Sequence, residues 1–181
     1  MNLITRLLYL ITIKITKLFS LLYNNKGDYM ERIEIVTKNS QETKELAARL
    51  AKYLFEGSLI TLSGQLGAGK TTFTQGLAKG LNIKKNVTSP TFNLLKIYNG
   101  DLPLYHIDAY RLEGINQDLG FDEYIDSDGI CVIEWSNFIK QLLPSELLNI
   151  EINILENDYR QLIFSAYGEK YERIVKQLCT L

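Results

Sequence analysis

The stretch that decides the fold reads Leu59-Ile60-Thr61-Leu62-Ser63-Gly64-Gln65-Leu66-Gly67-Ala68-Gly69-Lys70-Thr71-Thr72. Its first part, 59–62, is apolar and β-branched, which is typical of a buried strand. The next part, 64–71, fills every fixed position of the P-loop pattern G-x-x-x-x-G-K-[ST]. In that pattern, backbone N–H groups surround phosphate oxygens, the lysine reaches the outer phosphates, and the following helix directs its positive end at the anion.

This segment is therefore predicted to bind the phosphates of a nucleotide. The predicted binding residues are Gly64, Gln65, Leu66, Gly67, Ala68, Gly69, Lys70, Thr71 and Thr72. Among them, Thr71 is expected to offer its hydroxyl to Mg²⁺.

Length, charge and cysteine content limit the class of protein. With 181 residues, the chain is long enough for one α/β domain with a full core. The net charge is −1, whereas nucleic-acid binding usually needs a basic face, so we expect no sequence-specific contact with nucleic acid. The two cysteines, Cys131 and Cys179, fit neither a zinc-ligand spacing nor a disulfide framework. Such cysteine usage is typical of a reducing compartment, and we predict a cytoplasmic protein.

Residues 1–29 differ in composition from the rest of the chain. The segment 3–23 is mostly Leu, Ile, Thr and Tyr, but Arg6, Lys14 and Lys17 interrupt it. A membrane-spanning helix needs about 20 apolar residues without such charges. Two interpretations stay open: a poorly structured extension before a start at Met30, or an amphipathic helix lying on a membrane surface. We assign 1–29 to an N-terminal extension, 30–181 to the P-loop domain, and expect no membrane contact.

From residue 30 onward, hydrophobic periodicity predicts alternating strands and helices. Strands are predicted at 32–37, 59–62, 93–98, 102–107, 129–135, 148–155 and 161–166. Helices are predicted at 39–55, from 70 to about 80, and at 169–178. The first strand is expected at the edge of the sheet. The predicted architecture is a three-layer, P-loop NTPase-like α/β fold, whose central sheet is mostly parallel with antiparallel additions.

Two acidic residues stand at the ends of predicted strands. Asp108 closes the strand 102–107, and Glu134 closes the apolar run 129–135. In a doubly wound sheet the carboxyl ends of the strands meet at the crevice that holds the P-loop, so both acids are candidates for facing the phosphates. Thr71 and Glu134 are the predicted Mg²⁺ ligands, directly or through water. The alternative is that each acid is an ordinary surface carboxylate.

Other residues near these acids are also candidates for the site. The segment 86–92 combines Pro90 with three hydroxyl residues and is either a nucleotide-sensing switch loop or an ordinary turn. Arg111 and Arg160 are cations that either reach the nucleotide or form structural ion pairs. His106, the one histidine, is expected to pack in the core and to take no part in catalysis.

A guanine-specific motif is the alternative for the choice of base. The letters Asn25-Lys26-Gly27-Asp28 match N-K-x-D, in the order found in circularly permuted GTPases. However, the D-x-x-G element that should accompany it is unconvincing, because Asp126-Ser127-Asp128-Gly129 precedes a strand and does not follow one. Guanine is therefore the less favoured base.

The motifs taken together resemble one family. The sequence carries the P-loop 64–72, Ser89-Pro90-Thr91-Phe92, His106-x-Asp108-x-Tyr110-Arg111-Leu112 and Glu134-Trp135, in this order and spacing. This combination resembles the bacterial TsaE (YjeE) family over residues 30–181. The resemblance implies a small ATPase needed to make threonylcarbamoyladenosine next to the anticodon of tRNA, with TsaD and TsaB subunits as partners.

The resemblance also implies roles for individual residues. Lys70 would be the phosphate lysine, Thr71 and Glu134 the Mg²⁺ ligands, and Asp108 the acid required for ATP hydrolysis. The adenine would lie near Ser40 and Thr43, with Arg160 nearby. Two other functions stay open: a small-molecule P-loop kinase, for which no arginine-rich lid is found, and a nucleotide-gated binding module.

Overall fold

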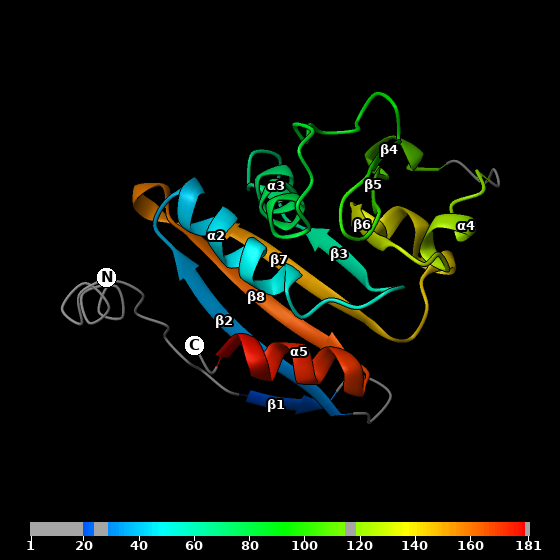
Figure 1. Cartoon of the computed structure of the whole chain (residues 1–181). Helices are drawn as coiled ribbons and strands as arrows, with labels where there is room; N and C mark the ends of the chain where they lie inside the picture. Colours follow the sequence, from blue (N-terminus) through cyan, green and yellow to red (C-terminus); the bar gives the residue numbers. More distant parts are fainter. Residues whose placement is uncertain (1–19, 24–28, 115–118, 180–181) are drawn as a thin grey trace.

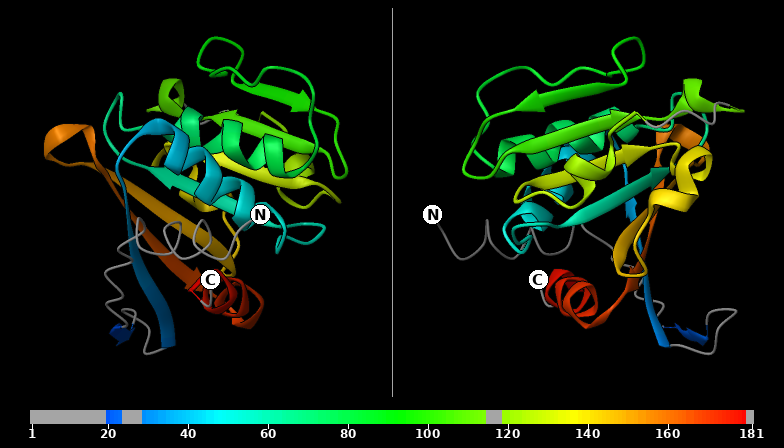
Figure 2. Two further views of the ribbon diagram at one scale, coloured as in Figure 1. Left: turned by 60° about the vertical axis from the view of Figure 1, so that its left-hand side comes forward. Right: turned by 90° about the vertical axis from the view of Figure 1, so that its right-hand side faces the viewer.

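The computed structural model describes residues 20–23, 29–114 and 119–179. The strands are β1 (Ser20–Tyr23), β2 (Tyr29–Thr37), β3 (Leu59–Ser63), β4 (Leu95–Tyr98), β5 (Leu104–Asp108), β6 (Ile130–Glu134), β7 (Leu147–Ile154) and β8 (Arg160–Tyr167). Within these described residues they form one eight-stranded sheet in the order β1-β2-β8-β7-β3-β6-β5-β4 (Figure 1). The sheet twists along its length, so that β2 and β8 run steeply across the direction of β4 and β5 (Figure 2).

The helices lie on both faces of this sheet. The α-helices are α2 (Ser40–Ala51), α3 (Lys70–Gly80), α4 (Asp122–Ile125) and α5 (Glu169–Cys179). The 3₁₀ helices are η1 (Tyr110–Leu112), η2 (Ser136–Leu142) and η3 (Glu156–Asp158). Side chains from α2, α3 and α5 form one hydrophobic core with the sheet, and side chains from η1, α4 and η2 form a second core with the opposite face. This confirms the predicted three-layer α/β architecture.

The centre of the sheet is parallel. Strand β3 pairs in parallel with both β6 and β7, and β5 pairs in parallel with β6. All residues of β6 are buried, because the strand is covered on both faces, as parallel strands usually are. The continuous apolar run that predicted this strand is the sequence signature of that burial.

The flanks of the sheet are antiparallel. On one side β4 pairs with β5, and on the other side β8 pairs with β7 and β2, while β1 pairs with β2. The predicted antiparallel additions to the sheet are therefore confirmed. The expectation that strand 32–37 lies at the edge holds for residues 33–37, which pair with β8 alone among the described strands, whereas β1 pairs with β2 at residues 29–32.

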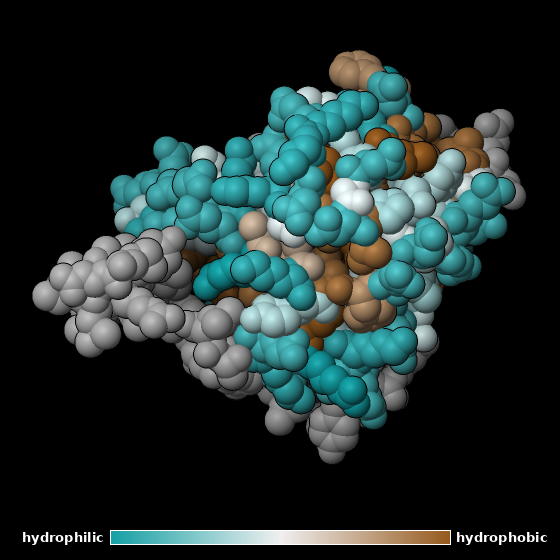
Figure 3. Space-filling model, viewed as in Figure 1, coloured by the Kyte–Doolittle hydropathy of each residue, from teal (hydrophilic) through white to brown (hydrophobic). Residues whose placement is uncertain are grey.

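Helices α2 and α3 pack directly against one another. A Cβ at Gly76 would lie 2.4 Å from the Lys44 carbonyl oxygen, and a Cβ at Gly80 would lie 2.5 Å from Cβ of Ala51. Because glycine has no side chain at these two positions, the backbones of α2 and α3 can pack closely against each other. On the face of the molecule that carries α2 and α3, most of the surface is hydrophilic, and hydrophobic residues are visible in the middle and toward β4 (Figure 3).

Two local predictions differ from the structure. Helix α2 ends at Ala51 and not near residue 55, because the Lys52 N–H bonds the Arg49 and Leu50 carbonyls and tightens the last turn. The two interpretations of 1–29, a poorly structured extension or an amphipathic helix, concern mostly residues 1–19 and 24–28, which lie outside the described residues, whereas Ser20–Tyr23 forms β1. In the described part of the chain, no helix combines the length and apolar character that crossing a bilayer requires.

Candidate functional site

The P-loop connects the end of β3 to the start of α3. Gly64, Gly67 and Gly69 have φ of 136°, 79° and 109°, a region that side chains strongly disfavour. At Gly64 a Cβ would also lie 2.3 Å from the carbonyl oxygen of Ile152, so this position admits glycine alone. These backbone conformations shape the loop around a cavity of about 200 Å³. The cavity is lined by Gly67, Gly69, Lys70, Thr71, Thr72 and Glu134.

Lys70 is held inside the loop by its own backbone. Only 5% of the residue is exposed, and Nζ donates to the carbonyl oxygens of Gly64 at 2.9 Å and Gln65 at 3.2 Å. Nζ also lies 4.3 Å from the ring centroid of Trp135, which covers the ammonium group. Burial lowers the pKa of Lys70, while the charges of Glu134 and Asp108 oppose that shift. The ammonium group therefore lies at the cavity with two carboxylates nearby.

Glu134 and Thr71 both line the cavity and contact each other. Thr71 Oγ1 donates to Glu134 Oε1 at 3.1 Å. Glu134 ends β6 and pairs with Leu62 of β3, which places it beside the strand that leads into the P-loop. A hydroxyl and a carboxylate beside a phosphate cradle are the oxygen donors that suit Mg²⁺, which often takes only one or two carboxylates plus phosphate oxygens. The residues present therefore fit a nucleotide with its Mg²⁺.

Asp108 lies directly beside Glu134 in the sheet. The two residues end the neighbouring parallel strands β5 and β6 and are partners in the register, and Asp108 is 2% exposed. Oδ2 accepts a hydrogen bond from Thr91 Oγ1 at 2.5 Å, and Oδ1 accepts one from the Tyr110 N–H at 3.0 Å. Ser89 Oγ lies 2.6 Å from Thr91 Oγ1. The candidate switch segment 86–92 thus contacts one of the two candidate acids.

The remaining predicted nucleotide-binding residues, Ser40 and Arg160, line a neighbouring hollow of about 270 Å³. It is lined by Lys38, Asn39, Ser40, Thr43, Gly67, Ala68, Gly69, Thr72, Asp158 and Arg160. The structure therefore brings Ser40 and Arg160, which are far apart in the sequence, to the same side of the P-loop. Arg160 Nε donates to the Ala68 carbonyl at 2.9 Å, which ties β8 to the loop.

Some predicted residues lie away from the cavity. Leu66 is 89% exposed at the tip of the loop, and its side chain lines neither hollow. The Arg111 guanidinium lies 4.5 Å from the ring centroid of Phe92, a residue that is itself 83% exposed. The guanine motif 25–28 lies outside the described residues.

His106 does more than pack in the core, which is all that the sequence predicts for it. It is fully buried, but its Nε2 also lies 2.9 Å from Glu134 Oε1, which makes it part of the site. The sequence holds a signal for this contact, because His106 precedes Asp108 by two residues and alternate residues of a strand share a face.

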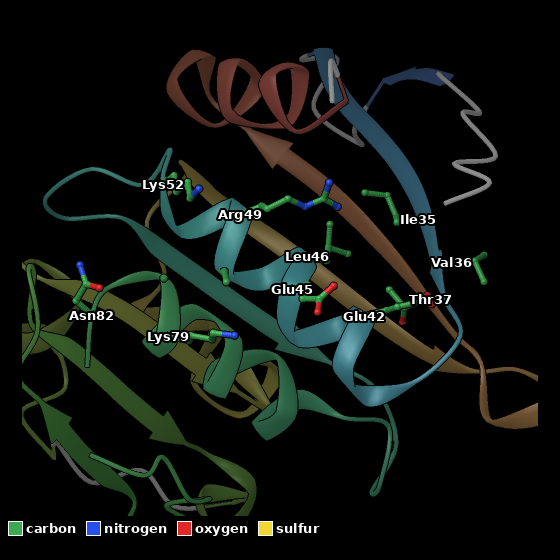
Figure 4. Close-up of a pocket in the computed structure, with 12 residues that line it drawn as sticks. Ile35, Val36, Thr37, Glu42, Glu45, Leu46, Arg49, Lys52, Lys79 and Asn82 are labelled. Carbon is green, nitrogen blue, oxygen red and sulfur yellow. The ribbon is translucent and has the colours of Figure 1, made fainter. Parts of the chain in front are cut away.

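A separate hollow of about 450 Å³ lies along α2 (Figure 4). Leu46 and Arg49 extend from the helix toward β2, where Ile35 and Thr37 lie. Its other lining residues are Val36, Glu42, Glu45, Ala48, Lys52, Lys79, Gly80 and Asn82. None of the P-loop residues lines it, so this hollow is distinct from the phosphate cavity.

The comparisons with known proteins agree on one family. The sequence model of the family "Threonylcarbamoyl adenosine biosynthesis protein TsaE" matches residues 37–162. The protein named tRNA threonylcarbamoyladenosine biosynthesis protein TsaE from Bacillus subtilis is 46% identical over 150 residues, which is 82% of this chain and 95% of that protein. The protein of the same name from Treponema pallidum is 40% identical over 129 residues, covering 70% of this chain and 96% of the relative.

A solved structure matches as well. The crystal structure of YdiB from Bacillus subtilis superposes with a TM-score of 0.73 at 40% sequence identity, covering 83% of this chain and 96% of that chain. Because the family match spans the P-loop, both acids and most of the sheet, it includes every element that builds the cavity. The chain belongs to the TsaE family of threonylcarbamoyl adenosine biosynthesis proteins.

Proposed function

We propose that this protein binds ATP with Mg²⁺ in the P-loop cavity and hydrolyses the ATP in support of threonylcarbamoyladenosine formation on tRNA. The observation that carries the proposal is the meeting of Lys70, Thr71 and Glu134 around one cavity of about 200 Å³. A second acid, Asp108, stands beside Glu134 in the sheet. The names of the relatives supply the link to tRNA modification.

Each side chain has a distinct task in this proposal. The backbone N–H groups of the P-loop and the Lys70 ammonium would hold the phosphate oxygens. Thr71 Oγ1 and a Glu134 carboxylate oxygen hold the metal. Mg²⁺, when bound with the nucleotide, neutralises the charge that develops on the phosphate oxygens.

Asp108 is proposed to orient the attacking water. The water oxygen forms a bond to the outer phosphorus while the bond to the bridging oxygen breaks, which gives ADP and inorganic phosphate. An acid at the end of a strand beside Glu134 suits that task, because its carboxylate accepts a hydrogen bond from the water. Thr91 donates to Asp108 Oδ2, so the segment 86–92 is positioned to respond when that oxygen changes partner.

The base is proposed to occupy the neighbouring hollow of about 270 Å³. Ser40 and Asn39 line it from the start of α2, and Arg160 lines it from β8. The hollow borders the phosphate cavity through Gly67 and Gly69, which suits a base that is joined to the bound phosphates.

The protein is proposed to act on partners and not on RNA directly. Its net charge of −1 offers no general attraction to a polyanion, which favours protein partners. We propose that these are the TsaD and TsaB subunits of the threonylcarbamoyl transferase complex, with ATP hydrolysis timing their cycle in the cytoplasm.

The pathway is tested in cells. The protein is depleted, and threonylcarbamoyladenosine is measured in bulk tRNA by mass spectrometry after complementation with the parent, Lys70→Ala or the exposed control Lys140→Ala. The parent and Lys140→Ala are expected to restore the modification, and Lys70→Ala is expected to fail. An unchanged level of the modification after depletion would rule out the proposed pathway.

A further inference from the structure

The hydrogen bonds around Glu134 are unevenly distributed between its two oxygens. Oε1 lies 2.9 Å from His106 Nε2 and accepts from Thr71 Oγ1 at 3.1 Å. The other oxygen, Oε2, accepts no hydrogen bond within the part of the chain that the structure describes. Because two groups hold the same oxygen, the carboxylate plane has one favoured orientation. That orientation leaves Oε2 for a ligand.

The proton on His106 follows from its partner. A carboxylate only accepts hydrogen bonds, so the short contact requires that Nε2 carry the hydrogen. The imidazole is completely buried, and its Nδ1 has no hydrogen-bond partner among the described residues. Burying a polar atom without a partner lowers stability, and an aliphatic side chain at this position would avoid that loss. An aliphatic side chain would, however, also remove the donor to the buried Glu134 carboxylate, so the contact with Glu134 is what a histidine supplies at this position.

We infer that His106 is a positioning residue, which fixes the Glu134 carboxylate so that Oε2 is held ready for the metal. This inference rests on the proposed function, because it takes Glu134 as a metal ligand. A hydrogen-bond donor that orients a metal-binding side chain often affects metal affinity without touching the metal itself. The strand geometry supports the role, since His106 on β5 is the register partner of Val132, two residues before Glu134 on β6.

The first test is spectroscopic and needs no substitution. His106 is the only histidine of the 181 residues, so untagged, ¹⁵N-labelled protein gives one set of imidazole nitrogen signals. We expect the tautomer with the proton on Nε2, and a change in the Nε2 signal when Mg²⁺ and ADP are added together. A neutral imidazole protonated on Nδ1 would overturn the inference, because Nε2 would then be unable to donate to Glu134.

The second test compares two amides at position 106. In His106→Gln the amide nitrogen replaces Nε2, whereas in His106→Asn it replaces Nδ1 and is too short to reach Glu134. Binding of a fluorescent ADP analogue is titrated with Mg²⁺ for the parent and both variants, and repeated in EDTA. We expect His106→Asn to raise the Mg²⁺ half-saturation about tenfold or more. His106→Gln should stay close to the parent, and nucleotide affinity in EDTA should be equal in all three proteins.

The outcomes separate this inference from the proposed function. If the parent itself shows no Mg²⁺-dependent nucleotide binding, the proposed function is wrong. If the parent binds and folded His106→Asn has the parent's Mg²⁺ half-saturation, only the role of His106 is wrong. Equal impairment of His106→Gln and His106→Asn would also overturn it, because shape and not hydrogen bonding would then matter. If neither variant folds, the tautomer of His106 in the parent decides whether Nε2 can donate to Glu134, and a proton on Nδ1 alone would overturn the inference.

Discussion

Thr91 Oγ1 donates a 2.5 Å hydrogen bond to Asp108 Oδ2, which joins a largely exposed loop to a buried acid at the end of β5. The loop is also held by Lys96, whose Nζ donates to Thr88 Oγ1 at 2.6 Å and to the Ser89 carbonyl at 2.9 Å. Position 91 is thus the direct link between the loop and the acid proposed to orient water.

Replacing Thr91 by Val removes this link at nearly constant volume. A hydrogen bond to a charged group contributes about 1.5–3 kcal/mol, so amide exchange over residues 88–93 should become about tenfold faster or more. Hydrogen-exchange mass spectrometry measures this, with Asn93→Ala in the same loop as the control. Unchanged exchange in Thr91→Val would show that the bond does not hold the loop.

Asp108→Asn separates binding from turnover. The amide keeps the size of the carboxylate and its oxygen still accepts a hydrogen bond from Thr91, but the negative charge that orients water is lost. We expect ATP affinity close to that of the parent and hydrolysis slower by about 100-fold or more. Release of phosphate under single-turnover conditions measures the rate, and Asp122→Asn on the exposed start of α4 is the control. Full turnover in Asp108→Asn would remove this acid from the mechanism.

Lys70→Met tests the electrostatic environment of the cavity through pH. Burial lowers the pKa of Lys70 in the folded protein below its ordinary value of 10.5. At pH values between the folded and the unfolded pKa of Lys70, the unfolded chain binds more protons than the folded chain. The free energy of unfolding of the parent therefore increases as the pH rises. The stability of Lys70→Met relative to the parent should therefore fall as the pH rises toward 10.5.

Urea unfolding at several pH values gives this difference directly. The exposed Lys140→Met variant controls for the general effect of removing a lysine. A relative stability of Lys70→Met that rises with pH would contradict a lowered pKa for the buried Lys70 ammonium group.

Ser40→Trp tests the hollow assigned to the base. Ser40 lines that hollow, whereas the next residue, Gln41, is exposed and does not line it. An indole at position 40 should occupy the space for adenine and weaken ATP binding about tenfold, which corresponds to about 1.4 kcal/mol. Affinity for inorganic triphosphate should be unchanged. Gln41→Trp is the matched control, and equal ATP affinity in both variants would place the base elsewhere.

Local patterns in the sequence were enough to predict the core of the fold. The apolar run 129–135 predicted a buried parallel strand, and the P-loop spacing predicted the turn between β3 and α3, because both patterns follow from short-range geometry. The meeting of Asp108 and Glu134 followed from a rule about strand ends. These features depend on few residues at fixed spacing.

Contacts that depend on the exact pairing of strands were harder to predict. The bond between His106 and Glu134 joins residues 28 positions apart, and only the register of β5 and β6 brings them together. Arg160 was a candidate because of its charge, but only the family resemblance placed it near the adenine, since no spacing rule connects β8 with the P-loop. The pairing of β1 with residues 29–32 of β2 was not predicted, because the alternating pattern of β2 does not show whether another strand pairs with it.

The central claim is that the cavity around Lys70 binds ATP with Mg²⁺ for hydrolysis. The most direct test is isothermal titration of ATP with Mg²⁺ into the parent, Lys70→Ala and Lys140→Ala, combined with phosphate release by the same preparations. We predict binding and hydrolysis in the parent and in Lys140→Ala. In Lys70→Ala we predict loss of hydrolysis by about 100-fold or more together with weakened binding. Folded Lys70→Ala that binds ATP and hydrolyses it at the parent's rate would contradict the assignment of this cavity.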